Sequence, residues 1–182
     1  PADVRAAVEV ALAEDVGKGD ITTQAIIPSG ARLRAIIVAR QPIVVAGVPV
    51  AVEVFRRIDR ESEIEIEAPD GSKVDSGAII ARLDGKASAI LPAERTALNF
   101  LQTLSGIATL TRKFVDRIEG TGAVLLDTRK TLPGLRALSK YATAVGGATN
   151  HRMRLDDGVL IKDNHVAVAG GVAEAVRRAK AK

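Results

Sequence analysis

The first part of the chain changes its hydrophobic periodicity several times, and each change marks an expected element. Val4, Val8 and Leu12 form one apolar stripe, which predicts a helix over residues 3–14. Pro49 sits where prolines favour a helix start, so a second helix is expected from there to about residue 58. Runs rich in β-branched or alternating apolar residues predict strands at 33–39, 43–46, 63–67, 79–83 and 87–91. This part therefore predicts a mainly antiparallel sheet with helices packed on it.

A long helical segment follows, and beyond it apolar strands alternate with helices. Residues 92–118 predict helix, with Pro92 near the start and a break into two helices at Ser105-Gly106. After this segment, buried strands are expected at 123–126 and 159–161, and helices at 135–145 and 172–180. Such alternation is typical of a parallel sheet that is covered by helices.

The predicted fold class is an α+β N-terminal sandwich followed by the beginning of an α/β barrel. We expect residues 1–106 to form the sandwich domain with its connecting helix, and residues 107–182 to form the first part of the barrel domain. Residues 121–182 have room for about two strand–helix units, because one βαβ unit takes roughly 30 residues. A closed barrel takes on the order of 200 residues or more, so the barrel is expected to be incomplete in this chain.

Composition excludes several classes of protein. The chain has no cysteine, which excludes a disulfide scaffold, a thiolate metal site and a cysteine nucleophile. Only 2% of the 182 residues are aromatic, which argues against a nucleic-acid platform that stacks bases. No apolar run approaches the roughly 18 residues that a membrane-spanning helix needs. Neither a nucleic acid nor a membrane is an expected partner.

Charge is distributed unevenly along the chain. The net charge is +4, but residues 128–155 contain six lysines or arginines and His151 without any aspartate or glutamate. Such a cationic stretch favours phosphate or carboxylate ligands, although a solvated basic face is an equally ordinary explanation.

Three polar clusters carry most of the candidate chemistry. The first is 127–131, where Thr128, Arg129 and Lys130 follow an apolar strand at the end where parallel sheets bind ligands. The second is 150–152, where Arg152 offers a bidentate fork to a carboxylate, and the third places Lys162 after the strand at 159–161. Together they predict one cationic pocket for a ligand with several negative charges. The alternatives are a plain polar loop, a structural His151, and a Lys162 that is paired with Asp163 or Asp127.

Five segments, in order along essentially the whole chain, together resemble the quinolinate phosphoribosyltransferase family, also called nicotinate-nucleotide pyrophosphorylase (carboxylating). The segments are Leu12-Ala13-Glu14-Asp15 with Gly19-Asp20-Ile21-Thr22-Thr23, Glu94–Phe100 with Leu104–Thr109, Asp127–Arg136, Asn150-His151-Arg152, and Ile161–His165.

The resemblance implies a reaction and a site. Members transfer a phosphoribosyl group from phosphoribosyl pyrophosphate (PRPP) to quinolinate with Mg²⁺, giving nicotinate mononucleotide, CO₂ and pyrophosphate in NAD biosynthesis. By matching motif, quinolinate would be held by Arg129, His151 and Arg152, with Arg95 reaching in from the other subunit of a homodimer. Thr128 would belong to the substrate-binding loop. Lys130 and Lys162 would lie between the two substrates as catalytic residues.

The same resemblance implies that the acidic residues for Mg²⁺ lie downstream of Lys182, so no metal ligand is expected within this chain and the chain alone is expected to be inactive. A cytoplasmic location is also implied. Three other functions stay open at this point: a paralogue that acts on another anionic ring, a non-catalytic dimerisation module, and a nucleic-acid binder, which the few aromatics disfavour.

Overall fold

The computed structural model describes residues 2–182, and the chain divides into two compact units. The first unit ends at Asn150 and the second runs from His151 to Lys182, so each is described by itself. The domain boundary expected at residue 106 lies inside a continuous helix of the first unit.

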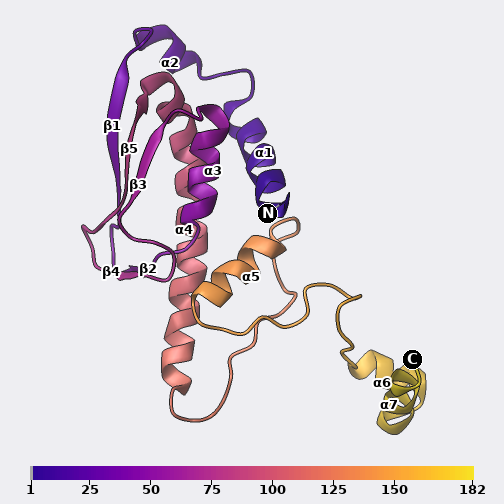
Figure 1. Ribbon diagram of the computed structural model, residues 1–182. Helices are drawn as coiled ribbons and strands as arrows, with labels where there is room; N and C mark the ends of the chain where they lie inside the picture. The colour runs from indigo at the N-terminus through magenta and orange to yellow at the C-terminus, as the bar shows by residue number, and fades with distance from the viewer. Residues whose placement is uncertain (1) are drawn as a thin grey trace. The chain divides into compact units, whose positions relative to one another are not determined.

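The first unit contains five helices and two small sheets among its described residues (Figure 1). Its helices are α1 (Ala2–Val16), α2 (Ile21–Ile26), α3 (Val48–Ile58), α4 (Ala87–Ile118) and α5 (Arg136–Val145). Its strands are β1 (Arg32–Val38), β2 (Ile43–Val44), β3 (Glu63–Ile66), β4 (Lys73–Val74) and β5 (Ile79–Lys86). The second unit holds α6 (Asp163–Ala169) and α7 (Val172–Lys180).

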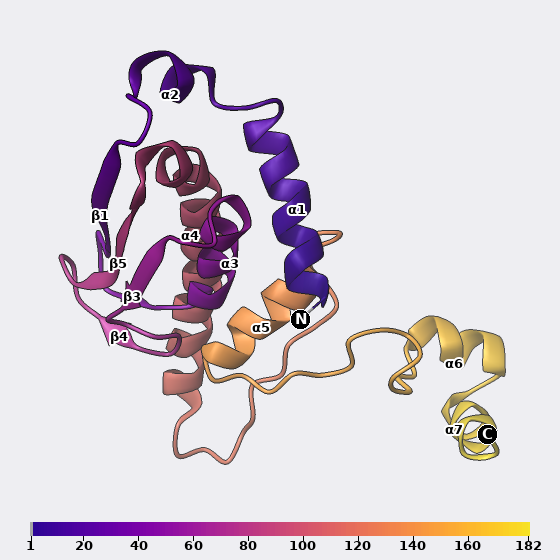
Figure 2. The same cartoon turned by 45° about the horizontal axis from the view of Figure 1, so that its top comes forward.

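The main sheet has the order β1-β5-β3, and both pairings are antiparallel, as the sequence predicted. Inward positions such as Leu33, Ile64 and Leu83 belong to the core or pack against it. Charged residues occupy the opposite face, where Asp84 forms ion pairs with Arg32 and Arg34. The sheet is therefore covered on one face by helices, and α3 and α4 lie side by side along it (Figure 2).

Helix α4 is longer than expected and unbroken. The break predicted at Ser105-Gly106 is wrong, because Ser105 is buried and its hydroxyl bonds both the amide and the carbonyl of Ala46. Gly106 lies on the exposed side of the helix, where a glycine costs only about 1 kcal/mol relative to alanine. The strand predicted at 87–91 is also wrong, since these residues form the first turns of α4.

The two buried strands predicted in the second part do not form. At 123–126 the backbone makes one parallel bridge, between Leu126 and Thr149, and Val124 is 67% exposed. Residues 159–161 form no strand, and Val159 is 77% exposed. An apolar run becomes a strand only when a neighbouring strand supplies its hydrogen bonds, and the described residues offer no such ladder here.

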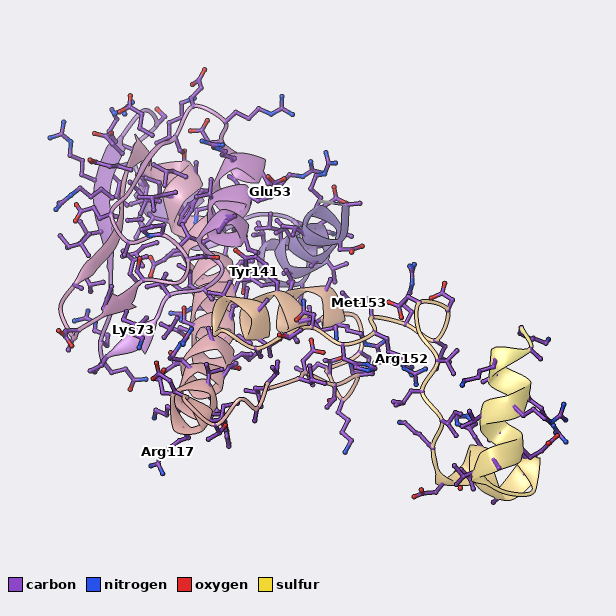
Figure 3. The ribbon with its side chains drawn as sticks, turned by 60° about the horizontal axis from the view of Figure 1, so that its bottom comes forward. Glu53, Lys73, Arg117, Tyr141, Arg152 and Met153 are labelled. Carbon is purple, nitrogen blue, oxygen red and sulfur yellow. The ribbon has the colours of Figure 1, made fainter. Side chains whose placement is uncertain are left out.

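Asp70 joins three segments of the first unit. Its carboxylate accepts hydrogen bonds from the amides of Gly47 and Val48, at 2.9 and 2.8 Å, and so satisfies two free donors at the start of α3. It also accepts a 2.5 Å hydrogen bond from the hydroxyl of Tyr141 on α5, which is labelled in Figure 3. The turn that holds Asp70 therefore ties α5 to the start of α3.

Candidate active site

The first cluster begins at a buried ion pair. Lys140 Nζ lies 2.5 Å from Asp127 Oδ1, and the two side chains are only 2% and 4% exposed. The backbone on either side of Leu126 is held as well, because the Asp127 amide donates to the Thr149 carbonyl and the Thr149 amide donates to the Leu125 carbonyl. The segment that carries Thr128, Arg129 and Lys130 thus starts from a fixed point.

Short-range hydrogen bonds shape the loop after Asp127. The Lys130 amide donates to Thr128 Oγ1 at 3.1 Å, and the Thr131 amide donates to the Arg129 carbonyl at 3.1 Å. Arg136 Nε, in the first turn of α5, donates to Thr131 Oγ1. These contacts form a compact turn in which Thr128 and Lys130 are exposed and Arg129 is half-buried.

Two arginines keep a buried nitrogen without a hydrogen-bond acceptor among residues 2–182. They are Arg129, in the first unit, and Arg152, in the second, and the atom concerned is Nε in both. A buried charged donor without an acceptor is costly unless a ligand supplies one. The chemistry of this donor set fits carboxylate or phosphate oxygens.

Arg152 and its loop are organised by carboxylates and carbonyls of the second unit. Arg152 Nη1 donates to the Gly158 carbonyl at 2.9 Å, which holds one edge of its guanidinium. Asp157 accepts hydrogen bonds from the Met153 and Arg154 amides. Desolvation opposes ionisation of Asp157, but these amides and the Arg154 charge lower its pKa below the ordinary value.

Arg154, which the sequence left without a role, pairs with Asp156. The Nε–Oδ1 distance is 3.2 Å, and both side chains are more than two thirds exposed. This pair closes the turn that follows Arg152. It adds little stability of its own, because exposed ion pairs are screened by solvent.

Lys162 lies immediately before α6 rather than at the end of a buried strand. It is exposed, and its amide donates to Nδ1 of His165 at 3.0 Å. The His165 ring therefore accepts the hydrogen bond of a backbone amide at the start of the helix. His151 is exposed, and Arg95 is exposed on α4 of the first unit.

The predicted site residues are thus distributed over both units. Thr128, Arg129 and Lys130 come together in the first unit, and the second unit carries His151, Arg152 and Lys162. The convergence of the two sets in one pocket stays a prediction.

Sequence reasoning missed Lys140. The sequence did contain a hint, because Asp127 stands at the end of an apolar run, where a buried carboxylate needs a cation as partner. Nothing in the pattern distinguished Lys140 from the other basic residues nearby.

Within residues 2–182, no group of three or more histidine, aspartate or glutamate side chains could hold a metal ion. In the same residues, no helix is both long and apolar enough to cross a membrane.

Two family models match the chain, one after the other. The N-terminal domain of quinolinate phosphoribosyl transferase matches residues 20–105, and the C-terminal domain of the same family matches residues 107–182. These two matches define the class of the chain as a phosphoribosyltransferase family.

Curated relatives and solved structures agree with the family models. The chain is 46% identical over 180 residues to the nicotinate-nucleotide pyrophosphorylase [carboxylating] of Mycobacterium leprae. This alignment covers 97% of this chain and 63% of the relative. A Synechocystis protein named "Probable nicotinate-nucleotide pyrophosphorylase [carboxylating]" is 44% identical over 166 residues. This alignment covers 91% of this chain and 56% of that protein. The structure of NadC from Streptococcus pyogenes superposes with a TM-score of 0.95 at 38% identity, covering all of this chain and 64% of that one.

The structure of the nicotinate-nucleotide pyrophosphorylase from Francisella tularensis superposes with a TM-score of 0.94 at 44% identity. The alignment covers 98% of this chain and 63% of that one. The chain belongs to the quinolinate phosphoribosyltransferase family, and it spans between about half and two thirds of the length of the relatives it matches.

Proposed function

We propose that the full-length protein that carries these residues transfers a phosphoribosyl group from PRPP to quinolinate, with loss of CO₂, to give nicotinate mononucleotide and pyrophosphate. The supporting observation is the pair of buried guanidinium nitrogens, on Arg129 and Arg152, that have no acceptor among the described residues. Quinolinate is a dianion and its co-substrate carries further negative charge, so both supply the acceptors that these cations lack.

In this proposal Arg129, His151 and Arg152 bind the two carboxylates of quinolinate and orient the ring. The pyridine nitrogen then faces the anomeric carbon of PRPP, where holding the reactants in line supplies much of the rate enhancement. Thr128 belongs to the same loop and helps to bind the substrate. No side chain acts as a covalent nucleophile.

The bond changes require positive charge rather than a base. The ring nitrogen forms a bond to the anomeric carbon while the carbon–oxygen bond to pyrophosphate breaks and its electron pair leaves with pyrophosphate. Lys130 and Lys162 stabilise this developing charge. The bond to the 2-carboxylate then breaks, CO₂ leaves, and the electron pair stays at ring carbon 2, where the adjacent ring cation stabilises it. This pair then forms a bond to a proton taken from water, which leaves hydroxide.

Mg²⁺ is expected to enter with PRPP, whose phosphates are its natural ligands. No step of this proposal is assigned to the ion.

We also propose a homodimer in which the exposed Arg95 of one subunit completes the site of the other. This places a further cation near the dianionic ring. We propose a cytoplasmic location, and a chain without cysteine is compatible with that reducing compartment.

Steady-state kinetics of the full-length protein test the assignment. With PRPP and Mg²⁺ present, kcat/KM for quinolinate should exceed that for nicotinate by at least about 100-fold. Nicotinate lacks the second carboxylate, so its binding leaves buried cations of the site unpaired. The active species should sediment as a dimer. A preference for nicotinate would favour the paralogue with another ring substrate, and an active monomer would contradict the role of Arg95.

A further inference from the structure

Lys140 is the most deeply buried charged residue that the proposed reaction leaves without a role. The whole residue is 1% exposed, and it is the largest of the fully buried side chains among the described residues. Burying an ammonium group is expensive unless a partner compensates it, and replacing a buried ion pair with apolar residues often raises stability. A buried pair at this place therefore calls for an explanation other than stability.

The position of Lys140 on α5 separates it from the packing face of that helix. Leu138 and Ala142, one turn apart, are buried and belong to the core of the first unit. Lys140 is two residues from each, which places it about 200° around the helix from Leu138. Its ammonium binds Asp127 instead of contributing to the apolar core.

A second polar side chain reaches the same carboxylate. With its amide nitrogen turned toward them, Asn150 donates to Asp127 Oδ2 at 2.9 Å and to the Lys140 carbonyl at 3.0 Å. The two carboxylate oxygens are thus held separately, one by Lys140 and one by Asn150. The Asp127 amide is held in turn by the Thr149 carbonyl.

We propose that Lys140 is a positioning residue, which fixes Asp127 and through it the orientation of the segment 127–131 that presents Thr128, Arg129 and Lys130. This inference rests on the proposed function for what the segment binds. A carboxylate clamped at both oxygens and at its own amide has little freedom to turn. The next three residues carry the groups that meet the anionic substrates.

The test uses the full-length protein and compares four variants with the wild type. They are Lys140→Met, Asp127→Asn, the double variant that combines them, and Leu138→Ala as a control on the same helix. For each, the melting temperature, kcat, KM for quinolinate and the backbone hydrogen exchange of residues 127–131 are measured.

Lys140→Met should lower the melting temperature, because the Asp127 charge stays buried without its cation. It should also lower kcat/KM for quinolinate about 100-fold, as a misplacement of about 1 Å does. Asp127→Asn should have the same two effects, since it leaves the Lys140 charge buried. Leu138→Ala should lower the melting temperature while kcat/KM stays within about twofold of the wild type, because its cavity lies in the apolar core, on the other side of the helix from Lys140.

The double variant separates positioning from stability. With both charges removed its melting temperature should return toward that of the wild type. Its kcat/KM should stay near that of Lys140→Met, and residues 127–131 should exchange faster than in the wild type or in Leu138→Ala. Recovery of kcat/KM together with the melting temperature would show a purely structural role and overturn the proposal.

Two further outcomes keep the test decisive. If Lys140→Met does not fold, Asn150→Ala removes the second contact to Asp127 at an exposed position. Its kcat/KM should then fall roughly tenfold at an unchanged melting temperature, and an unchanged kcat/KM would overturn the proposal. If the wild type has no activity at all, the proposed function fails. The exchange rates then still decide the positioning role, because equal exchange at 127–131 in all variants would refute it.

Discussion

Aspartate carboxylates fix the loops of this chain at the level of single residues. Asp70 binds two backbone amides and Tyr141, Asp127 binds Lys140, and Asp157 binds the two amides that follow Arg152. In each case a carboxylate satisfies donors that the backbone or a buried cation leaves free. The cationic residues of the candidate site are attached to loops that these contacts hold.

Tyr141 gives a prediction that depends on pH. Burial, and then the hydrogen bond to Asp70, raise the pKa of the Tyr141 hydroxyl above its ordinary value of 10.0. Because the folded form keeps the proton longer than the unfolded form, this contribution to stability is complete below about pH 10 and is lost as the pH rises further. Its size is limited by solvent, since Tyr141 is 38% exposed.

Tyr141→Phe should therefore lower the free energy of unfolding by about 1 kcal/mol at neutral pH, through loss of the hydrogen bond to Asp70. Urea titrations at about pH 8 and about pH 11 should show a smaller difference between wild type and variant at the higher pH. A difference that stays constant or grows with pH would contradict the linkage to Asp70.

The sequence identified the cationic residues of the candidate site but not the buried ion pair beside them. The arginines and lysines of the site were identified because they stand in motifs that follow apolar runs. The pairing of Asp127 with Lys140 was hidden, because a buried lysine looks the same in the sequence as an exposed one. Only the fold of α5 brings these two residues, 13 positions apart, together.

At the level of elements, the contact between α4 and α5 is set by a glycine. A Cβ on Gly146, which follows α5, would lie 2.6 Å from both the Ala108 carbonyl and Thr111 Cβ. The end of α5 therefore touches the α4 backbone directly. This contact fixes the far end of the helix that carries Lys140 and Tyr141.

Gly146→Ala should consequently lower the free energy of unfolding by about 1–3 kcal/mol, the usual cost of forcing atoms into a packed contact. Gly106→Ala on α4 is the matched control, because a Cβ there meets nothing within 4 Å. It should raise stability by about 0.5–1 kcal/mol, since alanine restricts the unfolded chain. Chemical denaturation of both variants checks the pair, and equal effects would refute the contact.

Elements with a clear period could be predicted, and elements that depend on neighbours could not. The helices α1, α3, α5 and α7 and the strand β1 were expected within a few residues of their ends. The strand at 159–161 failed because an apolar run does not show whether a partner strand is present. Helix α2 was missed because it has only six residues, too few to show a helical period. Its N-cap, Asp20, was noted only as part of a family motif.

At the level of the whole molecule, the fold class and the family could be predicted because five motifs stand in the correct order over the chain. Family models, relatives and solved structures confirm both. That the two groups of site residues meet in one pocket stays a prediction. Thr128, Arg129 and Lys130 belong to one compact unit, and His151, Arg152 and Lys162 to the other.

The most direct test of the account is the release of labelled CO₂ from quinolinate that carries the label in its 2-carboxylate. The full-length protein is compared with its Arg129→Ala variant and with Lys113→Met, which removes an exposed cation of α4 outside the proposed site. We predict release that requires quinolinate, PRPP and Mg²⁺ together, that falls at least about 100-fold in Arg129→Ala, and that is unchanged in Lys113→Met. No release from the folded wild type, or equal release from Arg129→Ala, would contradict the account.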